Sequence, residues 1–443
     1  MTDIIFSFDT EDYVNPKGAD GILRVGRILR EAGIKGCFNT VGWLAEALVR
    51  WGRQDVIEEL RHHEIETHSL RHSHHPTICE YTDLEDFDEA MAIFRQDEDE
   101  ALQITQKIIG NDRFYAACPP GWSISYVAHY GYADMGIPVC DGDAIYDPVQ
   151  GRAVSCCNMD CLVYKYSCDP FIHWEKEDIL KMMDEMAALE TCIVYHHPQK
   201  HVVTTFCDLQ NFNGENIEDD WILSDLLPEE TVRKFEENFR FFIDALKKDP
   251  RFRIVTYSDI ARKYDASGRV ICRADISSLK AALDEDFFPV TTPDTYSISD
   301  IFLACRDFLL GKEEHKCDKV YGFLDVPYAV PHPVKVTAEE MRESAAAMDV
   351  SRFLPTEITV SGKKMGPADW LRAALIILSG SKEATVVPDK WQIDLNEFPR
   401  LRDLTVKGSW VHSPKLEDRY LSDRMRLQTW TIRLPKGSKR RIF

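Results

Sequence analysis

A chain of 443 residues is longer than one hydrophobic core usually organises, so the sequence predicts two domains, the larger of about 250 residues. Its 74 acidic residues outnumber 53 lysines and arginines, and the resulting net charge of -21 repels nucleic acids and anionic membrane surfaces. We therefore expect a neutral or cationic partner and no nucleic acid.

Up to about residue 263, short apolar runs alternate with amphipathic stretches, which is typical of repeated βα units around a parallel sheet. Seven apolar runs are predicted to be strands: Ile4–Phe8, Gly36–Thr40, Glu64–Thr67, Phe114–Ala117, Leu162–Tyr166, Cys192–Tyr195 and Arg253–Thr256. Five stretches with apolar residues three and four positions apart are predicted to be helices: Gly21–Ala32, Val56–His62, Leu84–Ile109, Lys176–Leu189 and Glu229–Lys247.

Polar residues favour a barrel over an open sheet. They follow the carboxyl ends of separate predicted strands, where a (β/α) barrel gathers its active site: Asp9, Glu11, Asp12, His68, His72, His196 and His197. We therefore predict an α/β fold, a (β/α) barrel with about seven strands.

The regular strand spacing ends after Gly268, and helix-like runs such as Ser297–Leu310 and Ala368–Leu378 alternate with turns that contain proline. We place a domain boundary near residue 265. The prediction is a catalytic barrel at 1–265 and an accessory domain at 266–443 that is smaller and mainly helical or α+β. This accessory domain is expected to recognise carbohydrate or to mediate dimerisation, which would make the chain a homo-oligomer.

Three acids follow the first predicted strand. Asp9 and Glu11 are two residues apart, so they point to one side if the strand geometry continues. One of them could bind a metal while the other accepts a proton from water. Asp12 would then be a helper or a solvated loop acid.

Two histidines follow the third predicted strand in the spacing H-S-x-x-H. Four residues apart on a helical turn, His68 and His72 would face the same way and could donate ring nitrogens to one ion. The alternative to a metal site is that this segment is simply rich in histidine and binds no ligand. Together with an acid, the pair makes three ligands of the kind that Zn²⁺ prefers in catalytic sites.

These motifs, with Pro119-Pro120-Gly121 and the late His196-His197-Pro198, occur in the order found in the polysaccharide deacetylase family. The first 260 or so residues resemble this NodB-homology, or family 4 carbohydrate esterase, group. The resemblance implies a distorted barrel in which a divalent metal, usually zinc, is held by an acid and two histidines. Asp9 matches the general base of the family, and His68 and His72 match its metal ligands. The third ligand is Glu11, with Asp12 as the alternative.

The same resemblance implies that His197 protonates the departing amine, with His196 as the alternative. The family's R-x-P-x-G segment corresponds to Ala117–Trp122, but the arginine that orients the base is missing. We expect substrate contacts from the turn and from two aromatic rings: Pro120, Gly121, Trp122 and Trp174.

The predicted function is metal-dependent hydrolysis of an N-acyl group, N-acetyl in the simplest case, from a sugar or glycan precursor. One alternative is an imide or ureide hydrolase of the allantoinase-like branch. The other alternative is a carbohydrate-binding relic, a protein that binds carbohydrate but has no catalytic activity, which the missing arginine would favour.

The cellular location is inferred from three features. The first residues leave no room for a signal peptide, and no stretch approaches about 18 uninterrupted apolar residues. Thirteen cysteines without regular spacing indicate reduced thiols. We therefore expect a cytoplasmic protein without a membrane span.

Overall fold

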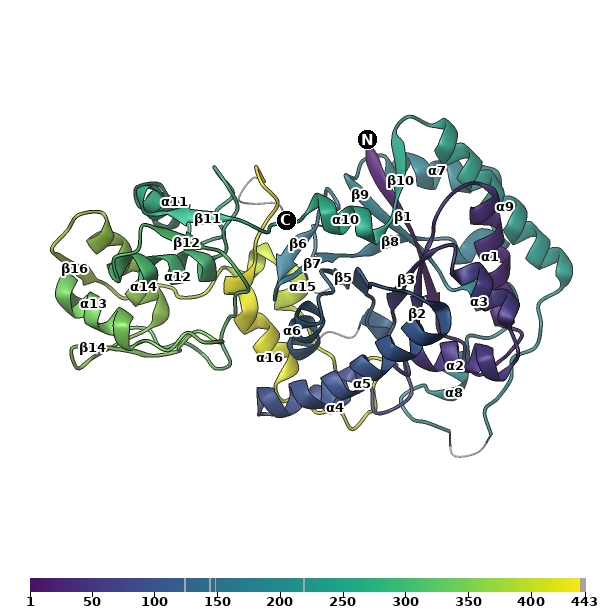
Figure 1. Cartoon of the computed structure of the whole chain (residues 1–443), viewed down its shortest axis with the longest axis horizontal. Helices are drawn as coiled ribbons and strands as arrows, with labels where there is room; N and C mark the ends of the chain where they lie inside the picture. Colours follow the sequence, from purple (N-terminus) through teal and green to yellow (C-terminus); the bar gives the residue numbers. More distant parts are fainter. Residues whose placement is uncertain (123–124, 143–144, 148, 218–219, 439–443) are drawn as a thin grey trace. The chain divides into compact units, whose positions relative to one another are not determined.

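The computed structural model describes residues 1–122, 125–142, 145–147, 149–217 and 220–438. The chain divides into two compact units (Figure 1). Unit 1 comprises Met1–Ala153, Met159–Lys263 and Leu404–Ser422. Unit 2 comprises Val154–Asn158, Tyr264–Asp403 and Asp423–Phe443.

The central strand of unit 1 is β1 (Thr2–Thr10), and all nine of its residues are buried. On one side it pairs along Asp3–Phe8 with β9 (Thr191–His196). On its other side the first half pairs with β10 (Phe252–Val255) and the second half with β2 (Cys37–Thr40). A strand covered on both edges and both faces must give each polar side chain a partner, as Arg253 and Lys263 do for Asp3.

The sheet continues from β2 in parallel register through β3, β4, β5 and β7, and from β9 to β8. Their bounds are β3 (Glu64–Thr67), β4 (Ala116–Ala117), β5 (Val139–Asp141), β7 (Met159–Leu162) and β8 (Tyr164–Ser167). Only Val163 separates β7, which pairs with β5, from β8, which pairs with β9. Strands close in the sequence thus lie near opposite ends of the strand order, so the sheet is curled into a distorted barrel.

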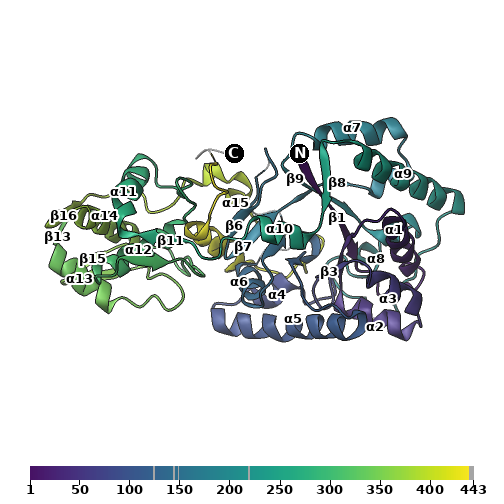
Figure 2. The ribbon, with the colours of Figure 1, turned by 45° about the horizontal axis from the view of Figure 1, so that its top comes forward.

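Helices cover the outside of the strands. The longer ones are α1 (Ala19–Glu31), α2 (Gly42–Arg50), α3 (Gln54–Leu60), α5 (Phe87–Ile109), α6 (Tyr126–Asp134), α7 (Lys176–Met186), α9 (Glu229–Lys248) and α10 (Tyr257–Lys263). Figures 1 and 2 both show α1 beside α3 and α9. Two short helices, α4 (Ile78–Thr82) and α8 (Cys207–Asn211), lie in the loops after β3 and β9.

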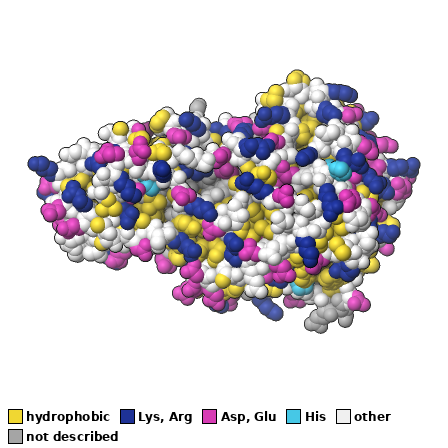
Figure 3. Space-filling view, viewed as in Figure 1, with side chains coloured by type: hydrophobic (Ala, Val, Ile, Leu, Met, Phe, Trp, Pro, Cys, Tyr) yellow, Lys and Arg dark blue, Asp and Glu magenta, His cyan; other side chains and the backbone are white. Residues whose placement is uncertain are grey.

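The packing of α9 on the sheet shows why its sequence forms an amphipathic helix. Phe239 and Phe242, one turn apart, both meet the Phe6 ring of β1 with centroids 5.7 Å away. Acidic residues begin the helix and Lys247 and Lys248 end it, which is the favourable orientation for the helix dipole. Figure 3 shows lysine and arginine side chains interspersed with aspartate and glutamate side chains over the molecular surface in view.

The distorted (β/α) barrel is confirmed, and each of the seven predicted strands overlaps a strand of the sheet. Among the strands and the longer helices of this unit, the sequence prediction missed β5, α2, α6 and α10. Strand β5 has only three residues, too few for a pattern, and α6 is buried at eight of its nine positions, so it has no polar face to create periodicity. All thirteen cysteines are free thiols.

Unit 2 combines helices with three two-stranded antiparallel sheets: β11 (Val270–Cys272) with β12 (Glu314–Lys316), β13 (Val334–Thr337) with β16 (Glu383–Val386), and β14 (Ile358–Val360) with β15 (Lys363–Met365). Its main helices are α11 (Ile276–Glu285), α12 (Ile298–Leu309), α13 (Ala338–Ala347) and α14 (Pro367–Leu378). The rings of Trp370, Phe302 and Trp430 form part of its core. It is therefore an α+β unit.

Among the described residues, no helix has the length and apolar character needed to cross a membrane.

A buried acid on α5 allows a test of the barrel's packing. Burial raises the pKa of Glu98 from 4.5 to about 7, although the Tyr132 hydroxyl donates a hydrogen bond to it at 2.9 Å. As pH rises from 4.5 to 7, the unfolded chain loses this proton while the folded protein keeps it, so the wild type loses stability in that window.

We expect the variant Glu98→Gln to escape this loss. Its free energy of unfolding relative to wild type should increase between pH 4.5 and 7 by an amount on the order of 3 kcal/mol and stay constant above. Urea denaturation at several pH values measures this difference. A difference that does not change with pH would mean that Glu98 is ionised in the folded protein.

Candidate metal centre and active site

The predicted acids and histidines of unit 1 converge at the carboxyl ends of the barrel strands. Asp9 lies in β1 and Glu11 follows it, His68 follows β3, and His197 follows β9. His72 lies four residues after His68. All but His197 are less than 5% exposed, so the barrel removes these charged groups from water and their partners must stabilise them.

Glu11 lies between the two histidines. One of its oxygens, Oε2, is 3.1 Å from Nε2 of His68 and 2.9 Å from Nε2 of His72. The other oxygen, Oε1, accepts a hydrogen bond from the Gln199 side chain at 2.8 Å. One donor atom from each of Glu11, His68 and His72 lies within 4.8 Å of the others, which is the spacing of ligands around one ion.

The remaining ring nitrogens of the two histidines are held by other groups. Nδ1 of His68 lies 2.5 Å from the carbonyl oxygen of Cys118, which can only accept a hydrogen bond, so Nδ1 is the donor of this pair and Nε2 faces Glu11. Nδ1 of His72 contacts the Asp208 carboxylate, which also accepts a hydrogen bond from Ser73. A carbonyl or carboxylate on the far nitrogen is the usual way to orient a histidine that binds a metal.

The prediction that His68 and His72 lie on a helical turn is wrong. Residues 68–76 form a loop, with Ser69 at φ 68° and His72 at φ 51°, in the left-handed region that non-glycine residues seldom adopt. The ring centroids of His68 and His72 are nevertheless only 4.4 Å apart. Backbone conformations of this kind cost energy and occur mainly at functional sites.

Asp12 has a different place from Glu11. Its Oδ1 accepts hydrogen bonds from the backbone N–H groups of Val14 at 3.1 Å and Asn15 at 2.8 Å, so it closes a turn before α1. Burial raises its pKa to about 7. In the described structure, its side chain does not join the Glu11, His68 and His72 cluster.

Asp9 is oriented by a neutral amide. The Asn39 side chain donates a hydrogen bond to Asp9 Oδ1 at 2.7 Å, and the Cys118 thiol lies 3.7 Å from the same oxygen. Asn39 itself is fixed by Ser7, which accepts its second hydrogen bond at 2.9 Å. The arginine that the resemblance led us to expect beside Asp9 is missing, and the Asn39 amide holds this carboxylate instead.

His197 faces Asp9 and Glu11. Its Nε2 is 3.8 Å from Asp9 Oδ2 and 3.9 Å from Glu11 Oε1, and its Nδ1 lies 2.8 Å from Asp169 Oδ2. The His197 backbone N–H also donates to Asp169. His196, the alternative, turns the other way and its Nε2 pairs with Nδ1 of His201 at 2.9 Å.

Charge explains how these buried groups titrate. Burial would raise the pKa of Glu11, but the charges of His72 and His197 outweigh it and hold the pKa well below its ordinary value. Burial would lower the pKa of His197, yet the Asp169 and Glu11 carboxylates raise it to about 8. His197 is therefore a proton donor at neutral pH, beside a concentration of carboxylates that attracts a cation.

The four residues predicted to contact the substrate lie in different environments. Pro120 is buried, and Gly121 is exposed with φ 54° and lies against Val411. The Trp122 side chain lies outside the described residues. The Trp174 ring packs on Phe171 at 5.6 Å, and its carbonyl accepts a hydrogen bond from Asn238 of α9, so it belongs to the helix packing.

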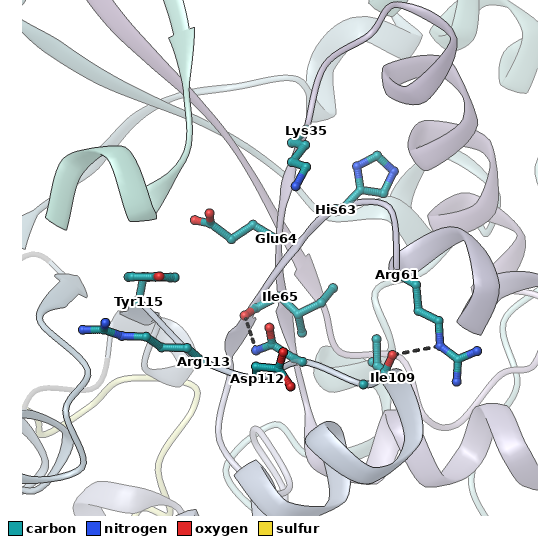
Figure 4. Close-up of a pocket in the computed structure, with 11 residues that line it drawn as sticks. Lys35, Arg61, His63, Glu64, Ile65, Ile109, Asp112, Arg113 and Tyr115 are labelled. Carbon is teal, nitrogen blue, oxygen red and sulfur yellow. Dashed lines mark hydrogen bonds between the residues drawn. The ribbon is translucent and has the colours of Figure 1, made fainter. Parts of the chain in front are cut away.

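Two other features lie apart from this centre. The side chains of His129, Cys140 and Cys161 also lie within 4.8 Å of one another, but they offer three donors where a structural zinc site has four. A pocket of about 510 Å³ is lined by Lys35, His63, Glu64 and Arg113, among others (Figure 4). These residues precede β2, β3 and β4, so the pocket lies at the amino ends of the strands.

The geometry predicts different effects for the two candidate acids. We expect Glu11→Gln to lose stoichiometric metal after dialysis, because an amide replaces the carboxylate between the histidines. Asp12→Asn should keep it, because asparagine can accept the same turn hydrogen bonds. Each variant replaces one buried carboxyl group with the amide of the same shape, so metal analysis of the purified proteins isolates the ligand. Equal loss in both would refute the assignment of Glu11.

The sequence matches no family model and no curated protein. Among solved structures, the chain is similar to a CE4 family pseudoenzyme from Bacillus anthracis, with 12% identity over 58% of this chain and 64% of that one and a TM-score of 0.34. It is similar to a peptidoglycan deacetylase from Bacillus subtilis, with 15% identity, coverage of 63% and 96%, and a TM-score of 0.32. For a 4-alpha-glucanotransferase from Thermococcus litoralis, the values are 13%, 60% and 40%, and 0.41. Structures of polysaccharide and peptidoglycan deacetylases are thus among its structural neighbours.

Proposed function

We propose that this protein is a metal-dependent hydrolase that removes an N-acyl group, N-acetyl in the simplest case, from a sugar or glycan precursor. The observation that carries the proposal is the convergence of Asp9, Glu11, His68, His72 and His197 at one end of the barrel. The strongly acidic chain also fits a neutral or cationic substrate better than an anionic one.

Glu11, His68 and His72 would hold the metal. Two histidines and one glutamate are a ligand set that catalytic Zn²⁺ uses, with room left for water and substrate. The fit rests on the two Nε2 atoms directed at one carboxylate oxygen and on the acceptors that hold both Nδ1 atoms. When bound, such a cation supplies Lewis-acid chemistry, since it polarises a carbonyl and makes water more acidic.

Asp9 would act as the general base. Its Oδ1 is occupied by the Asn39 amide, which leaves Oδ2 directed toward His197 and the space beside Glu11. A carboxylate held in this way can take a proton from the water that attacks the acyl carbon. Asn39 positions the base without adding a charge to the site.

His197 would act as the general acid. The Asp169 carboxylate holds its Nδ1 and favours its charged form, so Nε2 presents a proton on the side of Asp9. Delivery of this proton to the amine nitrogen breaks the C–N bond and releases the amine. The products are a carboxylate and a free amino sugar.

The direct test compares acetate release from N-acetylated sugars by the wild type and by Asp9→Asn. We expect Asp9→Asn to lose about 10²- to 10⁴-fold in kcat, the usual contribution of a general base, while it keeps its metal. Hydrolysis of cyclic ureides in place of sugar amides would favour the allantoinase-like alternative. Glycan binding without any turnover by the wild type would identify a non-catalytic relic.

A second test concerns the group that replaces the missing arginine. We expect Asn39→Ala to lower kcat roughly 10- to 100-fold, as is typical when the hydrogen-bond partner that orients a functional side chain is lost, with no change in metal content. Steady-state kinetics with metal analysis of the same preparation measures both effects. Activity equal to that of the wild type would show that Asp9 needs no amide to orient it.

A further inference from the structure

A second group of metal-binding side chains lies in unit 1, apart from the proposed metal centre. It consists of His129 of α6, Cys140 of β5 and Cys161 of β7, whose donor atoms lie within 4.8 Å of one another. All three residues are buried, each with less than 5% of its surface exposed. The proposed hydrolysis uses none of them, so their convergence needs an explanation of its own.

The pairing of β5 with β7 brings the two thiols together. Cys140 and Cys161 are direct partners in this parallel register, so their side chains project from the same face of the sheet. The next residue, Asp141, projects from the opposite face, where its carboxylate accepts a hydrogen bond from the Tyr257 hydroxyl at 2.7 Å. The Tyr257 hydroxyl also contacts Ser7 of β1, so that face is the interior of the barrel. The two cysteines therefore lie on the outer face.

Helix α6 packs against β7 (Figure 2) and supplies the third ligand. The carbonyl oxygen of Ser125, the N-cap residue of α6, lies 2.9 Å from Nδ1 of His129. Because a carbonyl oxygen can only accept, Nδ1 is the donor of this pair. In the neutral ring Nε2 then has the lone pair, and it lies 3.6 Å from Sγ of Cys140. A carbonyl on the far nitrogen is the usual way to orient a histidine that binds a metal.

The ligand types indicate which cation this group would bind. Two sulfurs and one imidazole nitrogen are soft ligands, which suit Cu(I) or Zn²⁺ better than Mg²⁺ or Ca²⁺. Structural Zn²⁺ almost always has four ligands, whereas among the described residues no fourth histidine, cysteine or acid joins these three. Copper accepts trigonal ligation by sulfur and nitrogen. The group therefore fits Cu(I) better than Zn²⁺.

We propose that His129, Cys140 and Cys161 form a binding site for Cu(I) between α6 and the outer face of the sheet. The inference does not depend on the proposed function. Binding exchanges two thiol protons for one Cu⁺, so two protons are released and the copper stays in the same oxidation state. The bound ion joins one helix to two strands and thereby stabilises the fold of unit 1.

The protonation of Cys161 is consistent with this exchange. A hydrogen bond with Cys140, together with burial, holds the pKa of the Cys161 thiol well above its ordinary value. This thiol therefore keeps its proton at neutral pH until a cation displaces it. A thiophilic cation can displace the proton because the thiolate, and not the thiol, is the strong metal ligand.

The test measures the Cu(I) affinity of the reduced protein by competition with the chelator bicinchoninate, followed until the distribution of copper no longer changes. We expect the wild type to hold one Cu(I) per chain. Cys140→Ser and Cys161→Ser should each lose more than about 100-fold in affinity, because loss of a ligand costs more than loss of a group that only orients one. The Zn²⁺ content should be the same in the wild type and in Cys140→Ser.

Cys305→Ser is the matched control, since it removes a buried thiol from α12 in unit 2. This variant should bind Cu(I) as the wild type does. Equal affinity of Cys140→Ser and the wild type would mean that other thiols hold the copper, and the proposal would be overturned. A Zn²⁺ content that falls in Cys140→Ser would overturn it too, because the site would then be a zinc site.

X-ray absorption at the copper K-edge tests the ligand set in the wild type, so this result does not depend on whether a variant folds. We expect two sulfur neighbours and one nitrogen neighbour around the copper. His129→Phe should lose the nitrogen and keep both sulfurs, with circular dichroism as the check that it is folded. Copper bound in the wild type by sulfur alone, or by nitrogen and oxygen alone, would refute the assignment.

Discussion

The whole of the candidate site depends on the burial of β1. Because β1 pairs along both edges, its direction and register are fixed, and its last residues must emerge at the carboxyl end of the barrel. Asp9 remains within the strand and is paired through Asn39, whereas Glu11 lies one step beyond the strand and reaches the histidines. One strand thus separates two carboxylates by two residues and gives them different partners.

This separation has a chemical meaning. A base and a metal ligand must be close enough to share a water molecule but must not compete for the same proton. Asn39 gives Asp9 a neutral donor, while Glu11 is surrounded by histidine nitrogens that favour its charged form. The two acids can therefore differ in role although they are almost adjacent in the sequence.

The sequence predicted well those features that follow from strand geometry. Residues after parallel strands must meet at one edge, so Asp9, Glu11, His68 and His197 could be expected to converge. The partners that hold their far sides could not be found in this way. Asp169 begins a short 3-10 helix, Asp208 lies in the short helix α8, and Asn39 lies on the neighbouring strand β2, and no motif surrounds any of them. Each becomes visible only when distant parts of the chain are brought together.

The choice between Glu11 and Asp12 shows the same limit. Both are acids after one strand. Glu11 contacts His68 and His72, whereas Asp12 accepts the turn hydrogen bonds of Val14 and Asn15, and neither difference can be read from the sequence. Residues 404–422 were the hardest to place from the sequence, since nothing in their composition indicates that they pack beside α4. The position of this segment depends on tertiary packing, which local sequence patterns do not predict.

The late position of residues 404–422 in the sequence affects the order in which unit 1 can fold during synthesis. A ribosome synthesises residues 1–263 well before residues 404–422, so the strands of the barrel can fold before the segment that packs on them exists. The larger part of unit 2, Tyr264–Asp403, is inserted between these two parts of unit 1. A barrel that folds early would therefore keep Gly121 and Cys79 uncovered until residues 404–422 have been made.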